Sequence, residues 1–236
     1  MTQEMEVRGP RHPSPNLGIL AIIFTVLFCA GLYAIARTTG GAHFPRPWDS
    51  AQTMAAYFQL HPRAVLLCAF LQFGAAVPLG IFTATIVSRL QFLGVRVAGA
   101  TIALYGGLAA SLATTCGAIL LWVLARPGIA TDVQLTRALY YLDFGAQGPG
   151  YSVPLALLMA GVSVPLLFYR FVPKWIAVFG LVVAGFGVLS WISIEFLPAS
   201  FFIPLTRFPG FLWMIAVGFA MPKAVGRREG SATPGL

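Results

Sequence analysis

The sequence is poor in charged residues, histidine and cysteine. Only 9% of its 236 residues are charged, and seven of these are acidic, whereas about a quarter of the residues in an ordinary soluble domain carry a charge. So few charges cannot cover the surface of a water-soluble fold. The cysteines Cys29, Cys68 and Cys116 lie singly inside apolar runs. We interpret them as small core residues, because no pair has the spacing of a redox or metal site.

Motifs of the common catalytic sites are missing as well. The three histidines, His12, His43 and His61, lie outside the long apolar runs, so no pair of imidazoles can hold a haem within a membrane. The sequence has no HExxH zinc motif, no Walker or GxGxxG loop and no GxSxG nucleophile motif. We therefore expect no catalytic residue, no metal and no cofactor. An enzyme, with lipid modification as its best case, ranks last among the possible functions.

Long apolar runs dominate what is present. Hydrophobic residues make up 58% of the chain, and the mean hydropathy is +0.83. A helix that crosses a membrane needs about 20 largely apolar residues. The sequence therefore predicts an all-α, polytopic transmembrane bundle of six helices. The predicted spans are Leu17 to Ala36, Ala64 to Ser88, Val97 to Ala125, Tyr151 to Tyr169, Trp175 to Ile194 and Phe201 to Met221.

The basic residues predict how the bundle is oriented. The net charge of +8 would suggest a nucleic-acid partner in a soluble protein, but the Lys and Arg residues stand at the ends of apolar runs, where they anchor helices. We therefore expect membrane lipids as partners, and no nucleic acid. Nine basic residues fall on one side of the predicted bundle and six on the other. The positive-inside rule then places both termini in the cytoplasm, at a bacterial inner membrane.

The predicted domain organisation is simple. Residues 1–16 form a mobile cytoplasmic segment, residues 17–222 form the transmembrane domain, and residues 223–236 form a disordered cytoplasmic tail. The outer loop, residues 37–63, contains one short surface helix.

Asp49 or Ser50 can cap this short helix in the outer loop. Its Met54, Tyr57 and Phe58 either lie on the membrane surface or pack on the bundle.

Ionisable residues at membrane depth invite a functional hypothesis, because their burial in lipid is costly. Asp143, Glu195 and Arg207 are the candidates. A helix rises about 1.5 Å per residue. Glu195 then lies near the outer edge of the membrane, whereas Arg207 lies about 9 Å below the outer end of the last helix. Only Arg207 is clearly sunk in the hydrocarbon.

A buried guanidinium favours a carboxylate in bidentate geometry. We therefore predict an outer-leaflet cluster of Arg207 with Glu195, Asp143 or both. Two interpretations stay open: a structural ion pair that holds the last helix to its neighbours, and a site for a ligand or substrate. Further residues expected to line this cluster are Gln147, Tyr140, Tyr141 and Tyr151.

Four stretches carry a family resemblance. They are "HPRAVLLCAFLQFGAAVPLGIFTATIVSRLQFLGVRVAGATIALYGGLAAS", "GPGYSVPLALLMAGVSVP", "VPKWIAVFGLVVAG" and "IPLTRFPGFLWMIAVGFAMP". They resemble a group of bacterial multi-pass membrane proteins that is catalogued only as a domain of unknown function. The resemblance covers roughly Arg37 to Pro222 and implies six helices and a bacterial source. It implies no activity and no catalytic residue.

Two function classes remain. The first is a non-enzymatic membrane module or accessory subunit that binds a lipid, a small apolar molecule or a membrane protein partner at its outer side. The second is a small transporter or channel-like protein. Transporters place polar residues and helix breaks near the membrane midplane, whereas here the ionisable groups gather at the outer edge. This favours the module. A continuous polar cavity from Arg207 past Gln72 and Thr114 to the inner loops would favour transport instead.

Overall fold

The computed structural model describes residues 12–38 and 43–224, and within these ranges the chain is helical, without a β-strand. Six helical segments are long and apolar enough to cross a membrane. This confirms the predicted all-α transmembrane bundle and marks the chain as a multi-pass membrane protein. The segments are α1 (Leu17–Thr38), α3 (Pro62–Phe92), α4 (Ala98–Leu124), α5 with α6 (Val133–Gln147 and Pro149–Tyr169), α7 (Lys174–Leu189) with the short η2 (Ser190–Ile194), and η3 (Leu197–Phe201) with α8 (Phe202–Ala220).

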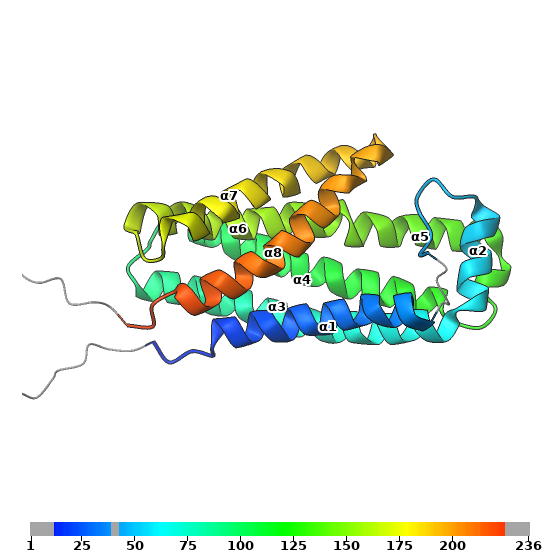
Figure 1. Ribbon diagram of the computed structural model, residues 1–236, viewed down its shortest axis with the longest axis horizontal. Coiled ribbons are helices and arrows are strands. Elements are labelled where there is room, and N and C mark those ends of the chain that lie inside the picture. The colour runs from blue at the N-terminus through cyan, green and yellow to red at the C-terminus, as the bar shows by residue number, and fades with distance from the viewer. Residues whose placement is uncertain (1–11, 39–42, 225–236) are drawn as a thin grey trace, which may run out of the picture.

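The bundle is elongated and its two ends differ (Figure 1). Both ends of the described chain lie at one end of the bundle, and α2 (Ala51–Leu60) lies across the opposite end. We call this opposite end the α2 end. Helix α8 crosses the other helices obliquely, whereas α3, α4 and α6 run along the long axis. The side of the membrane that the α2 end faces stays a prediction from the basic residues, which place it outside.

Glycine allows close contact between α4 and α6. A Cβ atom at Gly106 in α4 would lie 2.5 Å from the backbone oxygen of Pro154 in α6. Farther along the same pair, a Cβ atom at Gly161 would lie 2.5 Å from the backbone oxygen of Gly99. Larger residues at these positions would force the helices apart. Small residues at helix contacts are expected in a membrane, where association depends on close van der Waals packing.

The chain between α4 and α6 is largely helical, although none of the six predicted spans covers residues 126–150. Asp132 caps the N-terminus of α5: its side chain accepts hydrogen bonds of 3.0 Å from the N–H groups of Gln134 and Leu135. Helix α5 continues along the line of α6 to the α2 end (Figure 1). Together they form a segment of 37 residues, well beyond the length of about 20 residues that one crossing requires.

Helix α2 is the short helix of the outer loop. Ser50 caps it by accepting a hydrogen bond of 3.1 Å from the N–H of Thr53. Met54, Tyr57 and Phe58 are buried, and they belong to an apolar cluster that also includes residues of α3, α4 and α5. The helix therefore packs on the bundle, and these three side chains do not lie on the membrane surface.

The predicted mobile segments fall largely on residues 1–11 and 225–236, which lie outside the described residues. Within the described part, residues 12–16 are fixed at the end of the bundle opposite α2. Arg89 of α3 is fully buried and donates hydrogen bonds to Ser14 Oγ at 2.8 Å and to the carbonyl of Pro15 at 3.1 Å. The N–H of His12 bonds to the carbonyl of Lys223 at 2.8 Å. The structure thus ties the two ends of the described chain together.

Candidate functional site

A break between α5 and α6 leaves one backbone carbonyl, that of Gln147, without a helical hydrogen bond. Gly148 and Pro149 separate the two helices, and proline has no N–H with which to continue the helical hydrogen bonds. The N–H of Tyr151 bonds to the carbonyl of Gly148 at 3.3 Å and not to that of Gln147. The Gln147 carbonyl instead accepts a hydrogen bond from Nη2 of Arg207 in α8. One arginine therefore fastens α8 to the break.

The guanidinium of Arg207 rests on two aromatic rings. Its Cζ atom lies 5.0 Å from the ring centroid of Phe28 in α1 and 5.0 Å from that of Tyr151 in α6. The two rings are stacked with centroids 6.4 Å apart. Aromatic faces attract a cation, and the attraction grows where water is excluded. Arg207 thus joins α1, α6 and α8.

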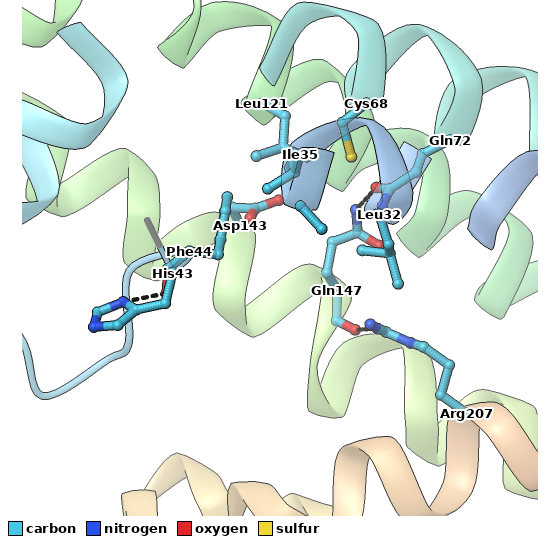
Figure 2. Close-up of a pocket in the computed structure, with 11 residues that line it drawn as sticks. Leu32, Ile35, His43, Phe44, Cys68, Gln72, Leu121, Asp143, Gln147 and Arg207 are labelled. Carbon is cyan, nitrogen blue, oxygen red and sulfur yellow. Dashed lines mark hydrogen bonds between the residues drawn. The ribbon is translucent and has the colours of Figure 1, made fainter. Parts of the chain in front are cut away.

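The side chain of Gln147 crosses to α3. Its Nε2 donates a hydrogen bond to Oε1 of Gln72, so this pair links α5 to α3 (Figure 2). Space for the side chain exists because residue 117 of α4 is glycine. A Cβ atom at Gly117 would lie only 2.2 Å from Cγ of Gln147. Gln147 is therefore held at two points: Gln72 binds its side-chain amide, and Arg207 binds its backbone carbonyl.

These residues line a cavity of about 510 Å³ at the α2 end, which we call the Arg207 cavity. Its volume lies within the range of about 300 to 1,000 Å³ that is typical of small-molecule sites. The polar lining residues come from α3, α5, α8 and, for His43, the loop before α2, and Figure 2 shows them arranged around the same space. The lining residues are Leu32, Ile35, Ala36, His43, Phe44, Cys68, Gln72, Leu121, Asp143, Gln147 and Arg207.

Several polar atoms at this cavity have no hydrogen-bond partner. They are Oδ1 of Asp143, Oε1 of Gln147 and Nε of Arg207. Asp143 is only 5% exposed, and buried polar groups in proteins are normally paired. Two acceptors and one donor therefore lie unpaired on residues that line the cavity, each covered by neighbouring atoms. A molecule that displaced the covering atoms would need a donor for Asp143, a donor for Gln147 and an acceptor for Arg207 to satisfy all three.

A loop covers the Arg207 cavity at the α2 end. The hydroxyl of Tyr140 donates to the carbonyl of Pro45 at 2.7 Å, and that of Tyr141 donates to the carbonyl of Pro47 at 3.0 Å. These bonds hold residues 43–50 against α5, so that Phe44 lines the cavity. A smaller cavity of about 280 Å³ adjoins it and shares Phe44, Asp143, Gln147 and Arg207 with it.

The structure brings together most of the residues that the sequence singled out. Arg207, Asp143 and Gln147 line one cavity, Tyr151 lies beside the guanidinium, Tyr140 lines the smaller cavity, and Tyr141 holds the covering loop.

Glu195 lies apart from this group. It is exposed, it lines neither cavity that contains Arg207, and it follows η2 at the tip where α7 turns into α8 (Figure 1). Arg207 and Asp143 do not form the expected bidentate pair, because Nε of the one and Oδ1 of the other are unpartnered.

Other residues of the site were not singled out from the sequence. The hydrogen-bond partner found for Arg207 is the Gln147 carbonyl at the α5–α6 break, not the carboxylate that we expected. Phe28 carried no signal, because the chain contains 19 phenylalanines. Gln72 could be recognised from the sequence, because a lone amide in an apolar helix predicts a hydrogen bond to another helix. Gln72 forms this bond with Gln147.

Comparison with known proteins gives no relative: no family model, no curated protein and no solved structure matches this chain. The resemblance to bacterial proteins of unknown function therefore stays a prediction.

Proposed function

We propose that this protein is a non-enzymatic module or accessory subunit of the bacterial inner membrane that binds a lipid or a small amphipathic molecule in the Arg207 cavity. The observation that carries the proposal is the set of unpartnered atoms on Asp143, Gln147 and Arg207 around one cavity of about 510 Å³. Apolar residues of α1 and α4 line the same space. Such a site suits a ligand with a polar head and an apolar body.

The alternative of a transporter is less well supported, because the polar lining of the cavity ends at Gln72. Thr114 is fully buried, and its hydroxyl bonds back to the carbonyl of Ala110 at 2.9 Å. About two and three turns beyond Gln72, α3 presents Leu79 and Phe82, both fully buried in the apolar core. These features favour binding at one end of the bundle over passage through it.

A structural role for Arg207 is compatible with this proposal. Its Nη2 holds α8 to the α5–α6 break, while its Nε has no hydrogen-bond partner. Holding the helices and binding a ligand therefore use different atoms of one side chain. The test must separate these two roles.

The test is to purify the full chain in mild detergent and to identify copurifying molecules by mass spectrometry. We expect a bound molecule in the wild type and at least a tenfold loss of it in Asp143→Asn, which preserves the shape of the side chain but replaces an acceptor oxygen with a donor. Arg207→Gln should lose the molecule as well and should also lower thermal stability.

The control is Arg96→Gln, because Arg96 is exposed between α3 and α4 and lines neither cavity. It should retain the molecule. Equal retention in Asp143→Asn, Arg207→Gln and the wild type would overturn the proposal.

A further inference from the structure

A second and larger hollow lies on the outer surface of α3 and α4, separate from the Arg207 cavity. Its volume is about 800 Å³, and we call it the α3–α4 groove. Its apolar side chains face away from the bundle: Phe70 is 74% exposed and Phe73 is 50% exposed. In a membrane these side chains contact lipid. Leu66, Leu67, Ile119 and Trp122 complete the apolar lining.

Two arginines stand at one end of this groove. Arg63 lies in the first turn of α3, and Arg126 follows the end of α4 at Leu124. Both therefore lie at the α2 end, where these helices leave the hydrocarbon. No acidic residue lines the groove, so its charge is positive.

Trp122 fixes the position of Arg126. The guanidinium lies 4.5 Å from the centre of the indole ring, and Nε of Arg126 donates to the carbonyl of Trp122 at 3.2 Å. Tryptophan favours the level of lipid head groups. Arg126 is thus held at the boundary between hydrocarbon and water.

The depth of the groove matches one leaflet of a membrane. Phe73 follows Arg63 by ten residues, which at about 1.5 Å per residue puts it about 15 Å deeper. The hydrocarbon core of a membrane is about 30 Å thick, so the groove reaches about half-way. On α4, Ala118 lies about 12 Å below Arg126 by the same rise. An acyl chain of one leaflet fits this span.

We propose that the α3–α4 groove binds an anionic phospholipid from the leaflet on the α2 side, with its phosphate between Arg63 and Arg126 and an acyl chain along Phe70 and Phe73. Guanidinium groups suit phosphate oxygens, to which they can donate two hydrogen bonds at once. Basic residues at a membrane surface also attract anionic lipids. This site is independent of the Arg207 cavity.

The test is native mass spectrometry of the full chain released from detergent, with added phosphatidylglycerol or phosphatidylcholine of identical acyl chains. We expect the wild type to bind phosphatidylglycerol more tightly than phosphatidylcholine. The double variant Arg63→Gln/Arg126→Gln should bind phosphatidylglycerol about tenfold more weakly, and Arg63→Lys/Arg126→Lys should retain most of the preference because it retains the charge.

Two further variants locate the lipid. Arg137→Gln removes a charge at the same end but outside the groove, and it should bind phosphatidylglycerol as the wild type does. Leu67→Trp fills the groove without changing the charge, and it should weaken binding. Equal binding of both lipids by the wild type, a preference that persists in the double glutamine variant, or unchanged binding by Leu67→Trp would each overturn the proposal.

Discussion

Replacing Gly117 with alanine tests how the polar part of the Arg207 cavity is held. The added Cβ atom would lie 2.2 Å from Cγ and 2.6 Å from Cδ of Gln147. No rotation of the alanine side chain relieves this contact, because Cβ is fixed to the backbone. Gln147 must therefore move away from α4, and its hydrogen bond to Gln72 breaks.

The expected loss of stability follows from three contributions. Overpacking a tight contact costs about 2 kcal/mol, and the lost interhelical hydrogen bond costs about 1 kcal/mol in a membrane. The higher helix propensity of alanine offsets about 1 kcal/mol. The free energy of unfolding of Gly117→Ala should therefore fall by about 2 kcal/mol.

Equilibrium unfolding in mixed micelles of mild detergent and dodecyl sulfate measures this loss. Gly145→Ala in α5 is the matched control, because a Cβ atom there meets no heavy atom within 4 Å; it should match the wild type or exceed it slightly. In Gly117→Ala/Gln147→Ala the clash is absent, so the double variant should lose clearly less stability than the sum of the two single changes. If Gly117→Ala is as stable as Gly145→Ala, the proposed packing of Gln147 is refuted.

Two other contacts yield predictions. Tyr140→Phe removes the hydrogen bond to the Pro45 carbonyl, so it should lower stability by about 1 kcal/mol and speed hydrogen exchange in residues 43–50; unchanged exchange there would show that this bond does not hold the loop. Arg89→Gln removes the hydrogen bonds to Ser14 and Pro15, so it should cost about 2 kcal/mol and speed exchange in residues 12–16. Arg96→Gln is its control, because Arg96 is exposed, and equal exchange in the two variants would contradict the assigned role of Arg89.

The six spans could be predicted because a membrane imposes a length of about 20 apolar residues on each crossing. The break before α6 could be predicted from Gly148, Pro149 and Gly150. Helix α5 could not, because it carries polar residues on the face that it buries: Thr136, Asp143 and Gln147 are all buried. Their burial depends on α2 and residues 43–50, which pack there from a distant part of the sequence.

Site residues could be predicted from the sequence where their type is rare in membrane spans, and could not where it is common. Arg207 and Asp143 stood out, because ionisable residues are costly within a membrane. The choice between Asp143 and Glu195 could not be made from the sequence, since it depends on how α7 and α8 meet. The tip between them exposes Glu195, whereas Asp143 of α5 is buried and lines the cavity.

A high-resolution structure of the protein purified in native lipid, without added ligand, tests the central proposal most directly. Our account predicts density for a bound molecule in the Arg207 cavity, with polar atoms within hydrogen-bond distance of Oδ1 of Asp143 and Nε of Arg207. A collapsed cavity in which Asp143 and Arg207 bind each other directly would contradict it, because the two side chains would then satisfy their own hydrogen bonds and leave nothing for a ligand.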